Sequence, residues 1–261
     1  PDAVTVGEIW VHGNEQFAKY LRPDELHLGF NFQLVQTDYD AAGIRAAIDN
    51  SLDAAALAGA APTWTLSNHD VPREVSRYGN GAAGLRRARA MALVKLALPG
   101  TVFIYNGAEL GLPNVELPDD VLQDPVWERS GRAERGRDGC RVPLPWSGSA
   151  PPFGFSSTPD TWLPIPADWK ALTVEAQRDD PDSTLTLYRR AIALRTGRAE
   201  FAGDTVEWLG DSTFRRPGGL VCAFNAGAVP VTLPAGEVLL TSGPLKDGLL
   251  PPDTAAWLAS A

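Results

Sequence analysis

The chain has 261 residues, of which 44% are hydrophobic and 21% charged, a composition typical of a globular protein with a sizeable core. Its formal net charge is −9 at pH 7, whereas binding to a nucleic-acid backbone or an anionic membrane surface requires clustered Lys and Arg. The charge argues against both partners, and no apolar run reaches the length of about 20 residues that a membrane-spanning helix needs.

The first hundred residues alternate between short apolar runs and amphipathic segments. Asp40 is a good N-cap for a helix in which Ile44, Ile48 and Leu52 line one face. Pro62 ends that helix, and Pro99 with Gly100 ends the next one. The expected elements are strands at residues 3–6, 26–35, 63–66 and 101–105, and helices at 14–21, 41–58 and through 85–96.

Four strands joined by helices predict a parallel sheet, because parallel neighbours need a crossover connection. The run at 101–105 is apolar throughout, as a parallel strand buried on both faces should be. Two closures fit this pattern, a doubly wound open sheet and half of an eight-stranded barrel. Periodicity does not choose between them.

Residues 106–182 are rich in Pro and charge and show little periodicity, and so long a connection is usually functional. Ser183 then caps a helix expected at 185–195. Short β-like runs separated by Gly and Pro follow, which predicts an antiparallel sheet. These runs lie at 205–209, 220–225, 229–233 and 238–241.

Chain ends and cysteines set further expectations. Pro1 leads almost at once into an apolar run, which is typical of a truncated chain. Export therefore stays open, and a cytoplasmic location is our working expectation. Cys140 and Cys222 lie far apart with no Cys/His cluster, so we expect two unpaired thiols. No acidic loop is typical of a cation site, so we expect no metal or other cofactor.

Polar side chains follow several of the expected strands. Glu8 follows the first, His69 and Asp70 follow the third, and Glu109 follows the fourth. Each has an ordinary explanation when taken alone: a solvated Glu8, or an Asp70 that caps a turn. Together, Glu8 and Asp70 are expected to face one pocket, because reactive side chains in parallel α/β folds lie just past the carboxyl ends of strands.

Longer motifs resemble those of the α-amylase superfamily, glycoside hydrolase family 13. The motifs that end its fifth, seventh and eighth barrel strands are similar, in order and spacing, to VGEIW at 6–10, SNHD at 67–70 and GTVFIYNGAELG at 100–111. Two further stretches resemble α-glucosidases and oligo-1,6-glucosidases more than starch-cleaving amylases. They are NHDVPREVSRYG at 68–79 and GRDGCRVPLPW at 136–146.

The resemblance implies the C-terminal half of a (β/α)8 barrel, strands five to eight, over residues 1–199, followed by a small antiparallel β domain over 200–261. It implies a retaining α-glucosidase that releases terminal α-linked glucose from short oligosaccharides. Two alternatives stay open. One is a glucosyl-transferring or isomerising relative, such as a trehalose synthase or a sucrose-acting enzyme. The other is a non-catalytic amylase-like binding protein.

The resemblance also implies roles for individual residues. Glu8 is the general acid/base and Asp70 the transition-state stabiliser. The expected substrate-binding residues are Asn68, His69, Arg73 and Arg141.

Two of these residues carry a second expectation. Arg141 would contact the terminal glucose or, alternatively, form a structural ion pair with Asp138 or Asp124. Arg73 would line the entrance as a salt-bridge partner, and Glu109 is taken as structural.

One departure from the family pattern concerns the nucleophile. Retaining enzymes need a second carboxylate roughly 5–5.5 Å from the acid. The family carries it in a Gly-Phe-Arg-x-Asp motif at the fourth strand, and no such motif occurs here, since Asp2, Asp38 and Asp40 stand in other contexts. We expect the nucleophile, and with it the linkage preference, in a missing N-terminal half that acts as the chain's partner.

Overall fold

The computed structural model describes residues 3–11 and 13–260, so the expectations about Pro1 and Asp2 concern residues outside it. The described chain forms two compact units. One contains residues of 1–66, 89–103 and 191–261, and the other contains residues 67–88 and 104–190. Two helices contribute to both units: α5 (Gly81–Ala97) and α8 (Thr184–Gly197).

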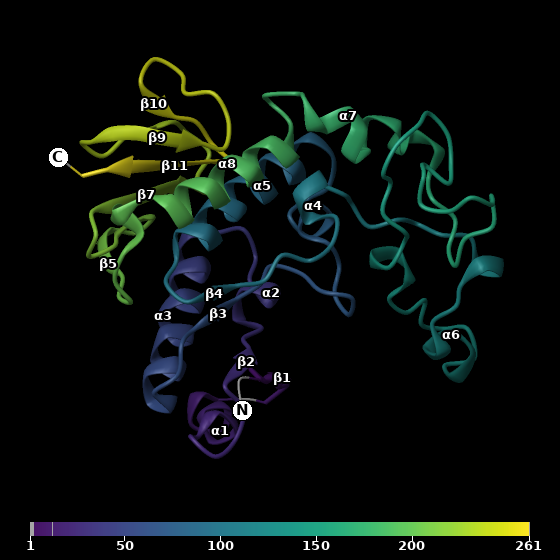
Figure 1. Ribbon diagram of the computed structural model, residues 1–261, viewed down its shortest axis with the longest axis horizontal. Helices are drawn as coiled ribbons and strands as arrows, with labels where there is room; N and C mark the ends of the chain where they lie inside the picture. The colour runs from purple at the N-terminus through teal and green to yellow at the C-terminus, as the bar shows by residue number, and fades with distance from the viewer. Residues whose placement is uncertain (1–2, 12, 261) are drawn as a thin grey trace. The chain divides into compact units, whose positions relative to one another are not determined.

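Two pairs of parallel strands lie in the first unit (Figure 1). Thr63 links the pairs, because its Oγ1 donates to the carbonyl of Gly29 at 2.6 Å and accepts from the N–H of Asn31 at 3.1 Å. The predicted parallel pairing is therefore confirmed within this unit. The strands are β1 (Val6–Glu8), β2 (Leu28–Phe30), β3 (Thr63–Trp64) and β4 (Thr101–Val102).

These strands are shorter than the sequence predicted. Residues 3–5 lie outside β1, whose ladder with β2 begins at the pair of Val6 and Leu28. Only part of 26–35 is strand, because Asn31 Oδ1 accepts from the N–H of Gln33 at 3.0 Å and the chain turns into helix α2 (Gln33–Gln36). The length of each strand is set by its pairing with a neighbouring strand, and the length of the apolar run in the sequence does not predict it.

The helices of the first unit follow the sequence closely. Helix α3 spans Ala41–Ala58, as predicted, since Asp40 accepts from the N–H of Gly43 at 2.7 Å and Gly59 ends it with a left-handed φ of 64°. The helix expected at 14–21 is present in two parts. They are α1 (Asn14–Ala18) and the 3-10 helix η1 (Lys19–Leu21).

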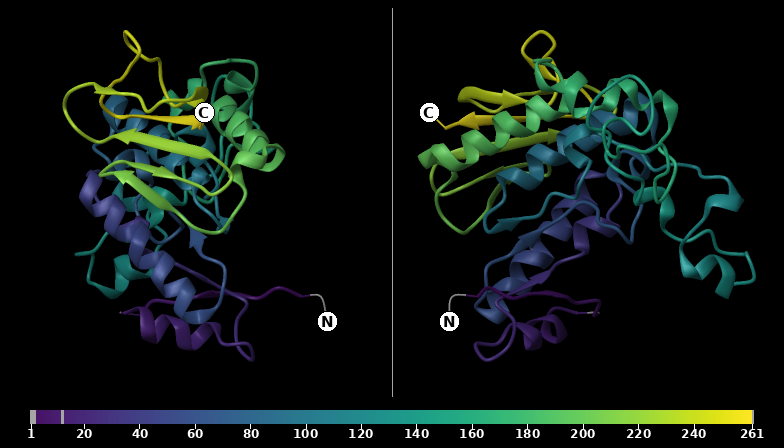
Figure 2. Two further views of the ribbon diagram at one scale, coloured as in Figure 1. Left: turned by 90° about the vertical axis from the view of Figure 1, so that its left-hand side faces the viewer. Right: turned by 45° about the vertical axis from the view of Figure 1, so that its right-hand side comes forward.

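An antiparallel sheet of five strands, in the order β5-β6-β7-β11-β9, closes the first unit (Figure 2). Trp257 is fully buried, lies edge-on to Phe201 and donates its indole N–H to the carbonyl of Leu93 at 3.0 Å. The antiparallel arrangement was predicted, but β6, β10 and β11 were not. The helices and strands from residue 199 onward, whether or not they belong to this sheet, are η6 (Ala199–Phe201), β5 (Glu207–Gly210), β6 (Thr213–Arg215), β7 (Leu220–Asn225), β8 (Val231–Thr232), β9 (Glu237–Thr241), β10 (Leu249–Leu250) and β11 (Thr254–Ala259).

The second unit is mostly irregular, as the sequence predicted. Its core is built from Leu110, Leu144, Phe153, Leu163 and Trp169, all buried. Both cysteines of the chain are buried and unpaired, as expected. The helices between 67 and 182 are short: α4 (Glu74–Arg77), η2 (Ala108–Leu110), η3 (Asp119–Val121), α6 (Pro125–Arg129), η4 (Asp138–Cys140), η5 (Ala167–Leu172) and α7 (Val174–Arg178).

Candidate active site

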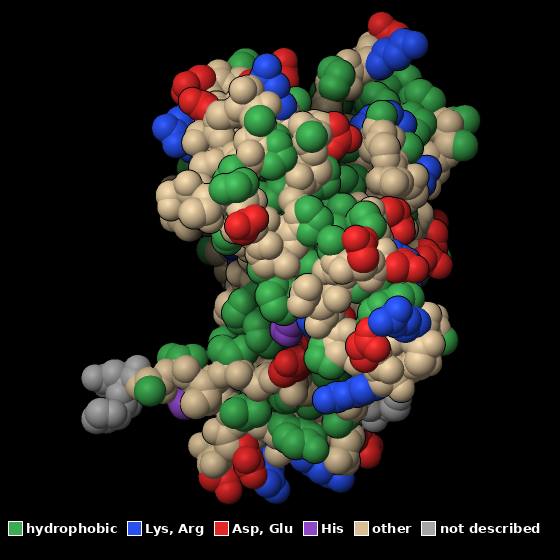
Figure 3. Space-filling model, turned by 90° about the vertical axis from the view of Figure 1, so that its right-hand side faces the viewer, with side chains coloured by type: hydrophobic (Ala, Val, Ile, Leu, Met, Phe, Trp, Pro, Cys, Tyr) green, Lys and Arg blue, Asp and Glu red, His purple; other side chains and the backbone are tan. Residues whose placement is uncertain are grey.

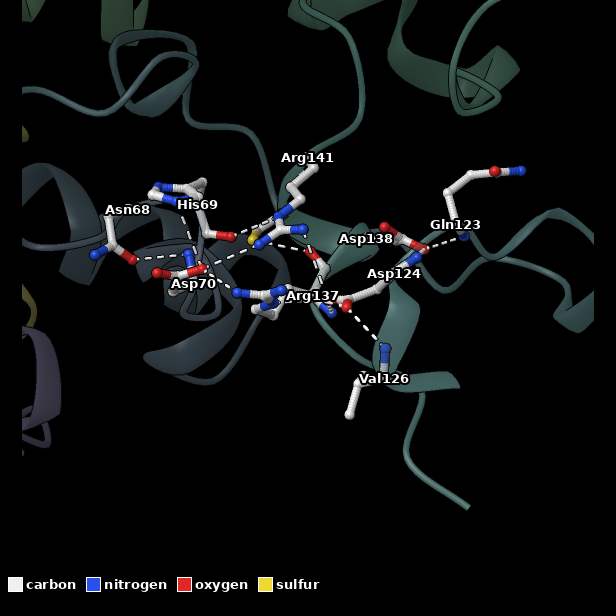
Figure 4. Close-up of polar contacts among 10 residues, drawn as sticks. Asn68, His69, Asp70, Gln123, Asp124, Val126, Arg137, Asp138 and Arg141 are labelled. Atoms are coloured by element: carbon white, nitrogen blue, oxygen red, sulfur yellow. Dashed lines mark hydrogen bonds and ion pairs between the residues drawn. The ribbon is translucent and has the colours of Figure 1, made fainter. Parts of the chain in front are cut away.

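Asp70 lies in the second unit, in the turn that follows Ser67, and is surrounded by basic side chains (Figure 4). Its Oδ1 accepts from Arg137 Nη1 at 2.6 Å and from Arg141 Nη2 at 3.0 Å. His69 Nε2 lies 3.6 Å from the same oxygen. The backbone N–H of Asp70 donates to Asn68 Oδ1 at 2.9 Å, which holds the turn. None of these contacts involves Oδ2.

The surroundings of Asp70 favour its ionised form. Burial raises the pKa of the Asp70 carboxyl, but the hydrogen bond from Arg137, the charges of His69 and Arg137, and the hydrogen bond from Arg141 outweigh it and hold the pKa below its usual range. The side chain is 19% exposed. The structure thus presents a partly accessible carboxylate, a kind of group that can stabilise a developing positive charge.

Arg137 and Asp124 complete this cluster; from the sequence, Asp124 was expected only as an alternative ion-pair partner of Arg141, and Arg137 had no assigned role. Arg137 Nε donates to Asp124 Oδ2 at 2.6 Å, and Asp124 also accepts from the N–H of Val126 at 3.1 Å. Asp138 is fully buried and accepts from the backbone of the segment before α6. The sequence did contain a signal for Arg137, because this residue stands in the motif at 136–146. Its contact with Asp70 could not be predicted, because the two residues lie 67 positions apart in the chain.

Arg141 meets one of its two expectations, the structural ion pair, while its contact with glucose stays a prediction. It donates to the carbonyl of His69 at 2.7 Å and pairs with Asp70, and its Nη1 lies 3.6 Å from Asp124 Oδ2. The ion pair with Asp124 considered from the sequence is therefore present. The side chain is 20% exposed, so it also presents polar surface beside Asp70.

Arg73 does not lie where the sequence placed it. It is 2% exposed, and its guanidinium donates to the carbonyls of Asn106 at 2.8 Å and Cys140 at 2.9 Å above the ring of Tyr105. These contacts cross-link three segments of the second unit, so the expected position at an entrance is wrong. Glu109, taken as structural, accepts from the N–H of Gly107 at 2.9 Å, and burial raises its pKa.

Glu8 belongs to the first unit, where it is the last residue of β1. Trp10 donates its indole N–H to Glu8 Oε1 at 2.9 Å and stacks on Phe32, with ring centroids 4.0 Å apart and an interplanar angle of 9°. Both aromatic residues line a pocket of about 260 Å³, together with Phe17, Phe30, Asn31, Gln33 and Gln36. Because Glu8 and Asp70 belong to different units, their convergence on one cavity stays a prediction.

Surface charge, apolar helices and possible metal ligands complete the description of residues 3–11 and 13–260. The face shown in Figure 3 has acidic and basic side chains interspersed, with no continuous cluster of Lys and Arg. None of the helices between residues 3 and 260, His12 apart, has both the length and the apolar character of a membrane span. In the same part of the chain, no three His, Cys, Asp or Glu side chains are grouped as metal ligands would be.

Comparisons with known proteins give consistent matches. The family model described as "Alpha amylase, catalytic domain" matches residues 1–203. The chain is 38% identical over 214 residues to a "Probable alpha-glucosidase" of Rhizobium meliloti, covering 80% of this chain and 38% of that protein. It is 29% identical over 227 residues to the "Glucan 1,6-alpha-glucosidase" of Streptococcus dysgalactiae, covering 74% of this chain and 42% of that protein.

Solved structures agree in fold. The α-glucosyl transfer enzyme XgtA is 33% identical, with a TM-score of 0.80 over 99% of this chain and 51% of that one. The trehalulose synthase MutB of Pseudomonas mesoacidophila is 25% identical, with a TM-score of 0.83 over 99% of this chain and 55% of that one. The chain thus spans about two fifths of these curated relatives and about half of these solved structures.

The motifs, the parallel strands, the C-terminal antiparallel sheet and these matches agree with one another. The fold is that of the α-amylase barrel family with a C-terminal antiparallel sheet, and the resemblance stated from the sequence is confirmed. The chain belongs to the α-amylase catalytic-domain family, glycoside hydrolase family 13, with α-glucosidases and oligo-1,6-glucosidases among its relatives.

Proposed function

We propose that this chain forms the second half of the catalytic barrel of a retaining α-glucosidase acting on short α-linked oligosaccharides. In this proposal residues 1–199 supply barrel strands five to eight and residues 200–261 form the C-terminal β domain. The parallel pairs β1–β2 and β3–β4 support the assignment, as does coverage of only 38% of the Rhizobium relative. The nucleophilic carboxylate then comes from a segment that this sequence does not contain.

Glu8 and Asp70 take complementary roles in the proposed mechanism. Glu8 protonates the glycosidic oxygen as the bond to the leaving sugar breaks, and later accepts a proton from the water that releases glucose. The Asp70 carboxylate stabilises the oxocarbenium-like transition state and binds sugar hydroxyl groups. His69, Asn68 and Arg141 bind the same glucose unit.

The observation that carries the proposal is the state of Asp70. Two guanidinium groups hold its Oδ1 at 2.6 and 3.0 Å, and Oδ2 takes no part in those contacts. A carboxylate fixed through one oxygen keeps the other for a ligand. In a family of glycosidases, a carboxylate of this kind at the end of the SNHD motif is better explained as a group that stabilises a cationic transition state than as a purely structural ion pair.

The pocket lined by Trp10, whose indole donates to Glu8, suits the leaving part of the substrate. Its lining combines aromatic faces from Trp10, Phe30 and Phe32 with side-chain amides from Asn31 and Gln33. Aromatic rings pack against the apolar face of a sugar, and amides bind its hydroxyl groups. We place the second sugar of the substrate here.

A chimera tests the proposal. The segment of the Rhizobium protein that matches this chain is replaced by residues 1–261, and glucose release from maltose and isomaltose is measured. We expect activity that Glu8→Gln reduces by about 10²- to 10⁴-fold, the range for loss of a catalytic acid or base, and that Asp70→Asn reduces by about 10²- to 10³-fold, the range for loss of a group that stabilises transition-state charge. Glu15→Gln, in the first turn of α1, is the matched control and should leave activity unchanged. Wild-type rates in the Glu8→Gln chimera would contradict the assignment.

A glucosyl-transferring or isomerising enzyme is the second candidate. It is favoured by the likeness to the α-glucosyl transfer enzyme XgtA at 33% identity. Transfer differs from hydrolysis in how well water is kept from the glucosyl intermediate. Product analysis of the chimera with maltose and with sucrose separates the two, because a hydrolase yields monosaccharides only, whereas a transferase or isomerase also yields new glycosides.

A further inference from the structure

One guanidinium group, that of Arg137, joins Asp70 and Asp124, two of the three carboxylates drawn in Figure 4. Arg137 presents Nε and Nη2 to Asp124, at 2.6 Å from Oδ2 and 3.3 Å from Oδ1, and Nη1 to Asp70 at 2.6 Å. The contact with Asp124 is bidentate, a geometry that fixes the plane of a guanidinium group. The nitrogen that reaches Asp70 is therefore held in direction as well as in distance.

Asp124 is itself held in place. Its side chain is 1% exposed, and Oδ2 also accepts from the backbone N–H of Arg137 at 3.0 Å. The backbone N–H groups of Gln123 and Asp124 donate to Asp138 Oδ2 at 2.5 and 2.8 Å. A chain of fixed contacts thus runs from buried Asp138 through Asp124 and Arg137 to Asp70.

Charge reinforces this geometry. The hydrogen bond from Arg137 is the largest cause that holds the pKa of Asp124 well below its usual range, against the effect of burial. The hydrogen bond to Asp124 is likewise the largest cause that raises the pKa of Arg137. Both groups stay charged over the whole range in which a glycosidase operates, so the contact with Asp70 does not come and go with pH.

Arg141 is a weaker candidate for the same task. Its contact with Asp70 is longer, at 3.0 Å, and its Nη1 lies 3.6 Å from Asp124. Its shortest hydrogen bond goes to the carbonyl of His69 at 2.7 Å. Arg141 therefore fastens the backbone of the turn, whereas Arg137 acts on the carboxylate.

We propose that Arg137, fixed by Asp124, is a positioning residue that holds the Asp70 carboxylate through Oδ1 and leaves Oδ2 for the sugar. This inference rests on the proposed role of Asp70 and adds the pair of residues that sets its orientation. A stabiliser free to rotate loses alignment with the developing charge, and misplacement by about 1 Å can cost about 100-fold in rate.

The test uses the full chain carried in the chimera described above. Arg137→Ala should lower kcat for maltose by about 100-fold and raise KM by a much smaller factor, since Arg137 acts on the bound sugar only through Asp70. Guanidinium chloride added to this variant should restore part of kcat, and sodium chloride at equal ionic strength should not. Arg137→Lys should recover little, because one ammonium group cannot contact both carboxylates in this geometry.

Two further variants sharpen the result. Asp124→Asn should lower kcat in the same direction, and Arg137→Ala with Asp124→Asn should be no slower than Arg137→Ala alone, because both changes break one linked contact. Arg135→Ala is the matched control, since that arginine stands in the same loop but pairs with Asp119. It should leave kcat unchanged.

Several outcomes overturn the inference. An unchanged kcat in Arg137→Ala, a loss confined to KM, or additive effects of the two substitutions would each contradict a positioning role. If the unsubstituted chimera releases no glucose, the proposed function fails. The inference about Arg137 is then tested by the orientation of the Asp70 carboxylate in crystal structures. Crystal structures with and without Arg137→Ala must then show the Asp70 carboxylate turned away from its original orientation, and an unmoved carboxylate overturns it.

Discussion

At the scale of single residues, Asp124 makes the chain sensitive to acid. The hydrogen bond from Arg137, opposed by burial, holds the pKa of the Asp124 carboxyl well below its usual range. In the unfolded chain an Asp carboxyl titrates at about pH 4. The stability it contributes is present in full above that pH and is lost as pH falls towards the folded pKa. We expect Asp124→Asn to lower the Tm of the chimera near neutral pH and to flatten the fall of Tm between about pH 5 and 3.

The control for this prediction is Asp119→Asn, whose side chain is 64% exposed and pairs with Arg135. An exposed pair contributes about 1 kcal/mol or less, so this variant should keep the steep acid branch of the wild type. Thermal melts followed by circular dichroism give both curves. An acid branch equally steep in Asp124→Asn would show that other carboxylates control acid unfolding.

The sequence predicted some of these residues and not their partnership. Asp70 and Arg141 stand in motifs that resemble a known family, so the sequence alone points to both. Arg137 stands in one of those motifs too, yet its two carboxylates lie 67 and 13 residues away. Only the folded loop brings them together, and neither periodicity nor spacing reports such a contact.

At the scale of elements, the C-terminal end of helix α5 depends on two arginines. Arg195 donates to the carbonyls of Leu96 and Leu98, and Arg216 donates to those of Ala97 and Phe201. The last carbonyls of a helix have no partner within it, and cations are favoured at that end. Burial is the first cause that lowers the pKa of Arg216, to about 10, so it is still charged at neutral pH.

We expect Arg216→Met to lower the free energy of unfolding by about 3 kcal/mol, because it leaves buried carbonyl groups without donors. Arg215→Met is the matched control, since the neighbouring side chain is 43% exposed and pairs with exposed Glu207, a contact that contributes about 1 kcal/mol at most. Urea unfolding of the two variants in the chimera measures the difference. Equal losses would show that the helix end does not need Arg216.

The elements also show where local signals suffice. Helix α3 matches its predicted bounds, since Asp40, the apolar spacing and Gly59 are all local in sequence. Strand β11 was missed because the segment Thr254–Ala259 is half alanine, which disfavours strands. Its pairing with β7 on one side and β9 on the other supplies what local preference lacks.

At the scale of the whole molecule, the order of the motifs along the chain identified the family. The pattern of strands and helices did not show whether the sheet is open or part of a barrel. Apolar runs joined by helices fit both an open sheet and part of a barrel, because both have parallel strands with crossover helices. The match of residues 1–203 to the α-amylase catalytic domain decides the fold family. It leaves the assignment of strands five to eight as part of the proposed function.

That assignment makes a prediction about residues 1–261 produced alone. Among the described residues, β1 pairs with β2 alone and β4 with β3 alone, so one edge of each pair presents free backbone groups. Open edges of apolar parallel strands promote aggregation. The sequence also lacks the Gly-Phe-Arg-x-Asp motif of the nucleophile. We therefore expect the isolated chain to be poorly soluble and to release no glucose from an α-glucoside.

The chimera, expressed and assayed under identical conditions, is the control, and it should be soluble and active if its remaining part covers these edges and supplies the nucleophile. Soluble fraction and glucose release are measured for both proteins. Glucose release by purified 1–261 would mean that one of its own carboxylates serves as nucleophile. Glu8 and Asp70 would then have to divide the chemistry differently, because a retaining enzyme needs one carboxylate bonded to the sugar while another delivers the proton.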